Sequence, residues 1–162
     1  MPLLPGERSQ ARRFDSPRQE AFLNLWRTYD RLRLLEDELF GRYELTAQQY
    51  NALRLMRAAH PRKLATLSLA ARLVSRAPDI TRLLDRLDER GLIDRERDLN
   101  NRRIVRVGLT KAGADLLDDL AGEVRNCHER QLGHLSPQEL QTLVALLRKA
   151  RQPHEPPGSN WS

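Results

Sequence analysis

The stretch Asp98 to Thr110, DLNNRRIVRVGLT, interrupts a chain that otherwise has the periodicity of helices. A polar run ends in two adjacent arginines, Arg102 and Arg103, and a short β-branched run follows. The preceding segment, LIDRER, is also short and of mixed pattern. Two short arms joined by a polar turn are typical of a two-stranded β-ribbon. The sequence therefore predicts that the basic loop, Asp98 to Arg103, forms the turn of a ribbon within a mainly helical protein.

Helix start signals surround this ribbon. Serine or threonine followed three residues later by glutamine or glutamate, the spacing of a capping box, occurs in SPRQ, TAQQ and SPQE. Together with the apolar periodicity, these signals predict helices that begin at Ser16, Thr46, Thr66, Pro78, Thr110 and Ser136. The first should end near Gly41, the second near His60 before a proline, and the fourth at Gly91.

The order helix, short helix, turn, helix and ribbon is that of a winged helix-turn-helix. We predict a mainly α fold with a small two- or three-stranded β wing, flanked by N- and C-terminal dimerisation helices. The terminal helices have strong apolar faces, which a second copy of the chain would cover. The predicted divisions are a disordered arm (1–15), an N-terminal dimerisation helix (16–45), the winged module (46–110), C-terminal dimerisation helices (111–151) and a flexible tail (152–162).

Charge is concentrated around the ribbon. The net charge is +6, and residues 62–111 hold 13 Lys or Arg against 7 Asp or Glu, whereas the rest of the chain is balanced. A localised excess of this kind is typical of a protein with a polyanionic partner. A solvated surface that happens to be basic is the alternative, and charge alone does not decide between the two.

Other functional classes find little support in the sequence. No apolar run approaches the ~20 residues that span a bilayer, and the N-terminus lacks the apolar centre of a signal peptide. The four histidines have neither the i, i+4 spacing of a metal site nor a paired cysteine, and no phosphate-binding glycine loop or Gly-x-Ser-x-Gly elbow occurs. We therefore expect a cytoplasmic protein that is not an enzyme, with no metal, no cofactor and no membrane partner. Cys127 is expected to be a small core residue rather than a redox sensor.

The central segment ITRLLDRLDERGLIDRERDLNNRRIVRVGLTKAG resembles the signature of the multiple-antibiotic-resistance regulator (MarR) family. The flanking segments LTAQQYNALRLM and LGHLSPQELQTLVALLRKA are similar to the family as well. The resemblance implies a dimeric winged-helix transcription factor, most often a repressor, that in many members releases DNA on binding a small phenolic molecule. The family loop usually reads Asp-x-x-Asp-Arg-Arg, and here Asn101 replaces the second aspartate. Asparagine accepts a hydrogen bond but forms no ion pair, so we expect a less rigid wing.

The resemblance and helix geometry together indicate which side chains face DNA. Arg103 is expected in the minor groove, and Arg102 on a phosphate or paired with a carboxylate. Bases are read by the first turns of the recognition helix, where Arg76 or Arg82 could bind guanine. Asp79 could accept a bond from cytosine, but we favour a helix-terminus role, and Asp85 with Arg86 resembles a buttress between helix and wing. The predicted DNA-binding residues are Thr66, Arg76, Pro78, Asp79, Thr81, Arg82, Arg86, Arg102 and Arg103.

The interpretation that follows is a homodimer that binds double-stranded DNA at a pseudo-palindromic operator, with recognition helices ~34 Å apart. A small aromatic ligand could bind between the dimer helices and the module, where candidates are Trp26, Tyr29, Arg33, Tyr50, Arg54 and His60. For each of these residues alone, an ordinary core or surface role is the simpler interpretation. Two alternatives stay open: a winged-helix adaptor for another protein, and a non-specific DNA-binding protein without an effector. The exposed positions of the basic window are mostly arginine, which disfavours the adaptor.

Overall fold

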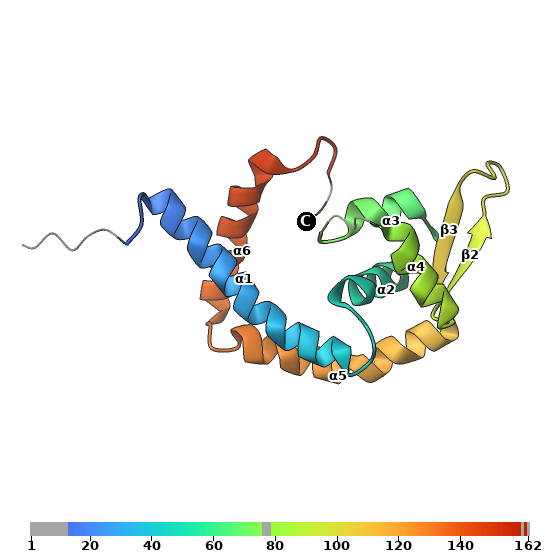
Figure 1. Cartoon of the computed structure of the whole chain (residues 1–162), viewed down its shortest axis with the longest axis horizontal. Coiled ribbons are helices and arrows are strands. Elements are labelled where there is room, and N and C mark those ends of the chain that lie inside the picture. Colours follow the sequence, from blue (N-terminus) through green and yellow to red (C-terminus); the bar gives the residue numbers. More distant parts are fainter. Residues whose placement is uncertain (1–12, 76–78, 160, 162) are drawn as a thin grey trace, which may run out of the picture.

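The structure is a computed structural model that describes residues 13–75, 79–159 and 161. Its elements are α1 (Pro17–Gly41), α2 (Ala47–Ala59), β1 (Leu64–Ala65), α3 (Thr66–Arg72), α4 (Ile80–Glu89), β2 (Ile93–Arg97), β3 (Val105–Leu109), α5 (Lys111–Leu132), α6 (Pro137–Arg151) and a 3-10 turn (Gln152–His154). The prediction of a mainly α fold with a small β wing is confirmed. Figure 1 shows α2, α3, α4 and the sheet gathered in one lobe, from which α5 runs back to α1 and α6.

Four predicted helix starts are confirmed, because their capping side chains bond to the helix backbone. Thr46 and Ser136 form complete capping boxes with Gln49 and Glu139. Thr110 accepts a hydrogen bond from the amide of Gly113. Ser16 accepts from the Gln19 amide at 3.1 Å, but the Gln19 side chain accepts from the Asp15 amide instead of completing the box. These caps satisfy amides that the helices themselves leave without partners.

The predicted start of α3 at Thr66 is confirmed, but its expected role as a cap is wrong, and the start of α4 also needs correction. Thr66 does not cap α3, because the N-cap position is Ala65 and no side chain bonds there. The Thr66 hydroxyl instead donates to the Val105 carbonyl at 3.1 Å. Helix α4 begins at Ile80, and its N-cap is Asp79, whose carboxylate accepts from the Arg82 amide at 2.9 Å. Pro78 and Arg76 themselves lie outside the described residues.

The sheet has three strands in the order β1-β3-β2, all antiparallel. Val107 at the centre of β3 lies opposite Leu64 on one side and Arg95 on the other. The Lys63 side chain crosses Gly108 and places its Nζ 2.9 Å from Asp94 and 2.8 Å from Glu96 on β2. A Cβ on Gly108 would lie 2.8 Å from Lys63 Cγ, so this crossing requires glycine. The ammonium thus ties the first strand to the second across the third, and the two carboxylates raise the pKa of Lys63.

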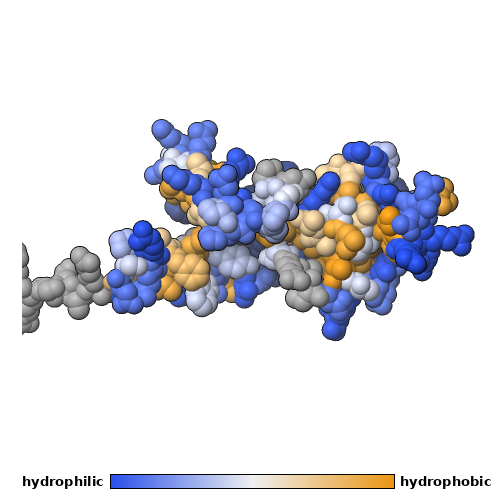
Figure 2. All heavy atoms as spheres, turned by 90° about the horizontal axis from the view of Figure 1, so that it is seen from above, coloured by the Kyte–Doolittle hydropathy of each residue, from blue (hydrophilic) through white to orange (hydrophobic). Residues whose placement is uncertain are grey.

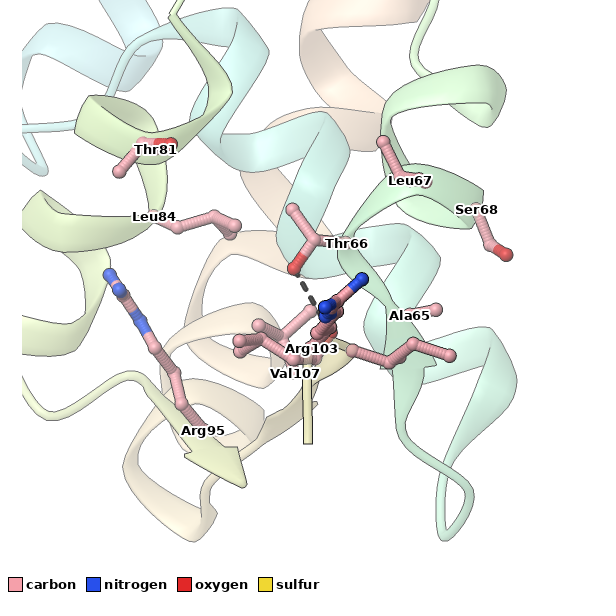
Figure 3. Close-up of a pocket in the computed structure, with 11 residues that line it drawn as sticks. Ala65, Thr66, Leu67, Ser68, Thr81, Leu84, Arg95, Arg103 and Val107 are labelled. Atoms are coloured by element: carbon pink, nitrogen blue, oxygen red, sulfur yellow. Dashed lines mark hydrogen bonds between the residues drawn. The ribbon is translucent and has the colours of Figure 1, made fainter. Parts of the chain in front are cut away.

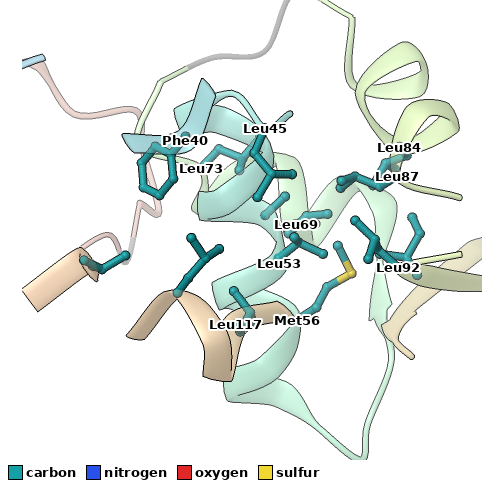
Figure 4. Close-up of a cluster of buried hydrophobic side chains, with 14 of the residues drawn as sticks. Phe40, Leu45, Leu53, Met56, Leu69, Leu73, Leu84, Leu87, Leu92 and Leu117 are labelled. Carbon is teal, nitrogen blue, oxygen red and sulfur yellow. The ribbon is translucent and has the colours of Figure 1, made fainter. Parts of the chain in front are cut away.

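The core is centred on α2 and joins both parts of the molecule. Leu53, Met56, Leu69, Leu87, Ile93, Val107 and Leu120 are essentially inaccessible to solvent, and Figure 4 shows part of this cluster. The apolar side of α4 faces this core, with Leu84 and Leu87 buried. Cys127 on α5 belongs to the same core, as predicted, and its burial raises the pKa of the thiol. Removing a large side chain from such a cluster typically costs about 2–5 kcal/mol.

The terminal helices leave much of their apolar surface exposed. Phe22, Trp26 and Tyr29 on α1 are 60–62% accessible, and α6 buries no residue at all in the single chain. The segment after α6 has local structure where it is described. It makes a 3-10 turn, and Glu155 accepts a hydrogen bond from Arg151 Nε at 2.6 Å. No helix within the described ranges is both long enough and apolar enough to span a membrane.

Candidate nucleic-acid interface

The exposed face of α4 carries the side chains predicted to read DNA. Arg82 and Arg86 are exposed on the side away from the buried Leu84 and Leu87, and Thr81 is exposed next to Leu84. Because Asp79 is held as the N-cap, the helix-terminus interpretation of this residue is confirmed. The carboxylate also offsets the positive end of the helix dipole. The exposed surface of α4 carries the guanidinium groups of Arg82 and Arg86, neither of which pairs with a described carboxylate, together with the exposed carboxylate of Glu89.

Helix α4 is fixed to the wing by a cluster of charges. Arg95 on β2 places Nη2 2.6 Å from Asp85 and Nε 3.4 Å from Asp88. The Nε contact is too poorly directed to be a hydrogen bond, so that buried nitrogen has no hydrogen-bond partner within the described structure. The predicted buttress role of Asp85 is confirmed, but its partner is Arg95, which the sequence did not reveal. Arg86 forms no ion pair with any described residue and points to solvent instead.

The C-terminus of α4 is also held by Arg90, a residue that the sequence did not single out either. Arg90 donates to the carbonyls of Glu44 at 2.7 Å and Tyr43 at 3.1 Å, in the connection between α1 and α2. The Tyr43 hydroxyl in turn donates to Glu123 on α5, and this bond is the main cause of the raised pKa of Tyr43. The C-terminal half of α4 is thus fixed both to the wing, through Asp85 and Asp88, and to the connection between α1 and α2, through Arg90.

Asp98 organises the wing turn. Its carboxylate accepts bonds from the amides of Asn100 at 2.9 Å and Asn101 at 3.1 Å, and from Arg106 Nε at 2.7 Å. The Arg106 bond, followed by the two amide bonds, holds the pKa of Asp98 below its usual value. A side chain that bonds amides two and three residues ahead fixes the turn without help from the rest of the protein. A backbone bond from the Asp98 amide to Ile104 closes the loop at 2.9 Å.

The turn exposes the side chains of Arg102 and Arg103 and bonds only to their backbone. The Asn101 side chain accepts from the Arg103 amide at 3.1 Å, so the expected acceptor role of asparagine is confirmed. Arg97 Nη1 donates to the Arg102 carbonyl at 2.9 Å, which supports the turn from the adjoining strand. Both Arg102 and Arg103 are exposed, and neither pairs with a carboxylate in the described parts of the chain. Their charges are therefore free for a polyanion.

A groove of about 470 Å³ lies between the wing and helices α3 and α4. Figure 3 shows Arg95 and Arg103 at its wing side, with Thr66, Thr81 and Leu84 across from them. The Thr66 hydroxyl has one hydrogen to donate and gives it to Val105, so it has none left for a phosphate unless that bond opens. In the space-filling view of Figure 2, hydrophobic surface over this lobe is surrounded by hydrophilic side chains.

A second cavity, of about 390 Å³, is lined by α1, α2, α5 and the connection from α3 to α4. Of the candidate ligand residues, Tyr29, Tyr50 and Arg54 line it, whereas Trp26, Arg33 and His60 do not. The Tyr50 ring stacks on Phe40 with centroids 4.5 Å apart, and burial raises the pKa of its hydroxyl. Val74 and Ser75, in the connection from α3 to α4, complete one wall. His128 on α5, which sequence reasoning missed, also lines this cavity.

The lobe, its exposed α4 face and its basic wing define a winged helix-turn-helix DNA-binding module. Residues 45–105 match the model of the family described as MarR family. The chain is 58% identical to a MarR transcription factor from Planctomyces limnophilus, over 85% of this chain and 99% of that one, with a TM-score of 0.67. The protein belongs to the MarR family and is a DNA-binding transcriptional regulator.

Two further solved structures are similar to this chain. A mutant MarR from Escherichia coli complexed with operator DNA is 26% identical over 81% of this chain and 93% of that one, with a TM-score of 0.73. BpsR from Bordetella bronchiseptica, whose DNA binding is regulated by 6-hydroxynicotinic acid, is 24% identical over 83% and 95%, with a TM-score of 0.74. The second likeness shows the fold alone.

Proposed function

We propose that the protein is a homodimeric repressor that binds a pseudo-palindromic operator and is relieved by a small aromatic acid. The observation that carries the DNA-binding part is the fixed pair of α4 and wing. Arg95 joins them, while Arg82, Arg102 and Arg103 stay unpaired at the surface that they form. Guanidinium groups that no carboxylate already holds bind phosphates and base edges without first breaking an ion pair. The operator complex of the Escherichia coli relative supports this assignment.

The dimer is supported by the apolar faces of the terminal helices. The exposed aromatic residues of α1 and the unburied face of α6, which includes Val144 and Leu146, form surface that a single chain leaves in water. A twofold axis through these helices would place two copies of α4 about one DNA turn, ~34 Å, apart. Each half-site would then receive one recognition helix and one wing.

Operator binding is tested by recovering preferred duplexes from a randomised library and repeating the binding at two salt concentrations. We expect protection of a pseudo-palindrome and a steep loss of affinity with salt, because several phosphates are neutralised. A non-specific DNA-binding protein would show the salt dependence without a preferred sequence. An adaptor would bind no duplex better than bulk DNA. A reporter gene placed behind the recovered operator then decides between repression and activation.

Ligand control is supported by the cavity that joins α1, α2 and α5 to the connection before α4. Arg54 supplies a positive charge and Tyr29 and Tyr50 supply rings, which suits an aromatic carboxylate. We expect salicylate to release the operator from the parent protein, and Arg54→Ala to need a much higher concentration. Arg33→Ala is the matched control, since Arg33 does not line the cavity. If a broad panel of aromatic acids left operator affinity unchanged, the proposal that a ligand releases the operator would be wrong. The proposal that the protein binds an operator would be unaffected.

A further inference from the structure

Leu99 is the most exposed large apolar side chain among the described residues, at 99% accessible. It lies at the turn of the wing, which projects beyond the rest of the lobe in Figure 1. Single exposed leucines are common on protein surfaces and need no explanation by themselves. This one is unusual in its position, because it shares a short loop with Asn100, Asn101, Arg102 and Arg103.

The loop around Leu99 cannot fold over to bury the side chain. Asp98, directly before it, bonds the amides of Asn100 and Asn101, directly after it. The Ile104 amide bonds to the Asn101 carbonyl at 2.9 Å and closes the second half of the turn. Leu99 is therefore held in water by a turn that hydrogen bonds fix on both sides of it. Such a side chain gains free energy only when a partner covers it.

The charge of the loop identifies what that partner is. Arg102 and Arg103 are exposed and unpaired with any described carboxylate, so whatever reaches the wing turn must accept two positive charges per chain. The minor groove of DNA accepts them and also offers apolar surface, namely the sugars and the base edges of its floor. Proteins that enter this groove often place an apolar side chain beside their basic ones.

We propose that Leu99 is a specificity-determining contact that packs into the minor groove at the outer edges of the operator and selects A·T base pairs there. The inference rests on the proposed operator binding and adds to it. A·T pairs present only acceptors on the groove floor, whereas guanine adds its N2 amino group. Leucine offers that amino group no acceptor and would leave it desolvated, so a G·C pair is disfavoured.

The test uses the duplex that the parent protein selects from a randomised library, with the wing position located by hydroxyl-radical footprinting. At that position, A·T, G·C and inosine·cytosine pairs are compared, because inosine lacks the amino group of guanine. We expect the parent to bind the G·C duplex roughly tenfold more weakly than the A·T duplex, and inosine·cytosine to restore binding. Leu99→Ala should lose roughly fivefold to tenfold on the A·T duplex and most of this discrimination.

Matched variants separate the apolar contact from the charged one. Leu99→Asn supplies an acceptor for the guanine amino group and should abolish the preference for A·T. Leu99→Ala and Leu99→Asn should keep the parent salt dependence, since no charge is removed, whereas Arg103→Ala should make it shallower. Asn100→Ala, a change at the neighbouring position that keeps the amide bond to Asp98, should alter affinity by less than about twofold.

The outcomes are distinct. If the Leu99→Ala variant kept the A·T preference of the parent, whatever its affinity, the preference would belong to Arg103 and the role of Leu99 would be overturned. If the parent itself preferred no duplex over bulk DNA, the proposed operator binding would be wrong, and this inference would fall with it. Unfolding transitions that match the parent confirm that the variants differ only at the surface.

Discussion

The wing turn and the first half of α1 are both exposed, but they are organised in different ways. The wing turn is shaped by its own hydrogen bonds, three of them to the Asp98 carboxylate. The apolar face of α1 has no such support: Phe22 and Trp26 contact each other with ring centroids 6.3 Å apart, and little else covers them. The wing turn can therefore hold its conformation before a partner binds, whereas the apolar face of α1 is removed from water only when a partner covers it.

The two surfaces should also differ in what one substitution does to them. Burying one large apolar side chain is worth about 1.5–3 kcal/mol, and a symmetric interface uses each such side chain twice. A single guanidinium in a DNA groove is worth about 1–3 kcal/mol, screened by salt. We therefore expect larger effects from the α1 face than from the wing, and a different dependence on salt.

The largest effect is expected for Trp26→Asp. Trp26 is 62% exposed in the single chain, so the change removes no core contact but places a charge in the proposed dimer face. The dimer should dissociate at micromolar concentration, and operator affinity should fall by roughly 100-fold or more, because two linked half-sites no longer bind together. Light scattering and a binding titration measure the two effects.

Asn24→Asp is the control for that variant. At about 100° per residue, Asn24 lies well away from Trp26 around the helix, and it is exposed. The variant adds the same charge outside the proposed dimer face, so the dimer and its operator affinity should be retained. A parent protein that is monomeric in solution would contradict the assignment of the α1 face altogether.

The next largest effect is expected for Arg103→Ala. The residue is exposed and only its backbone amide supports the turn, so thermal stability should change by less than ~0.5 kcal/mol. Operator binding should weaken by about 1–3 kcal/mol per site, and the salt dependence should become shallower by roughly 1–2 units for two wings. Arg82→Ala should instead relax the base preference at one position in each half-site. An Arg103→Ala variant with parental affinity and salt dependence would show that the wing does not contact DNA.

The local parts of this structure could be predicted from sequence, because their signals lie within a few residues. The caps at Thr46, Thr110 and Ser136 and the ribbon around Asp98 are of this kind. Thr66 misled because its hydroxyl bonds to Val105, on a strand far along the chain. A serine or threonine before an apolar run indicates a cap only when no tertiary acceptor competes for it.

The cross-element contacts could not be predicted. Arg95, Arg90 and Lys63 are each one arginine or lysine among many, and their partners lie on elements whose packing the sequence does not specify. The same reason explains the cavity proposed to bind a ligand, where Tyr29, Tyr50 and Arg54 come together but Trp26, Arg33 and His60 do not. Residue type indicated suitable chemistry, and only the tertiary arrangement shows which side chains meet.

A smaller effect is expected when the wing turn is acidified. Because the folded-state pKa of Asp98 is lowered, its contribution is present above the ordinary aspartate value, about 3.9, and is lost as the pH falls through the lower folded value. The amide resonances of Asn100 and Asn101 should therefore be constant from about pH 8 to pH 5 and shift only below about pH 4. Asp98→Asn keeps an acceptor for the amides but loses the charge facing Arg106, so it should disturb the turn less than Asp98→Ala. A turn that loosened near neutral pH would contradict the role given to this carboxylate.

The smallest effect is expected for Arg151→Gln at the end of α6. As in the wing turn, the side chains here are held in place by contacts within the same short segment. Arg151 pairs with Glu155 at 2.6 Å and lies over the Trp161 ring, 4.4 Å from its centroid. Arg151→Gln removes both contacts, yet partly exposed pairs of this kind are worth less than about 1 kcal/mol. In a Trp26→Phe background, where Trp161 is the only tryptophan, the emission of this residue should shift toward that of a solvated indole.

Arg148→Gln is the matched control, because Arg148 is exposed and forms no ion pair with the described residues. It should leave the emission of Trp161 unchanged. Both variants should bind operator as the parent does, since the proposed wing contacts to DNA use Arg102 and Arg103, whereas the guanidinium of Arg151 is already paired. A loss of operator affinity in Arg151→Gln but not in Arg148→Gln would mean that the end of α6 supports the DNA module. The end of α6 would then be a second surface, besides the wing, that is held by its own contacts and needed for DNA binding. The terminal helices could no longer be described by their apolar dimer faces alone.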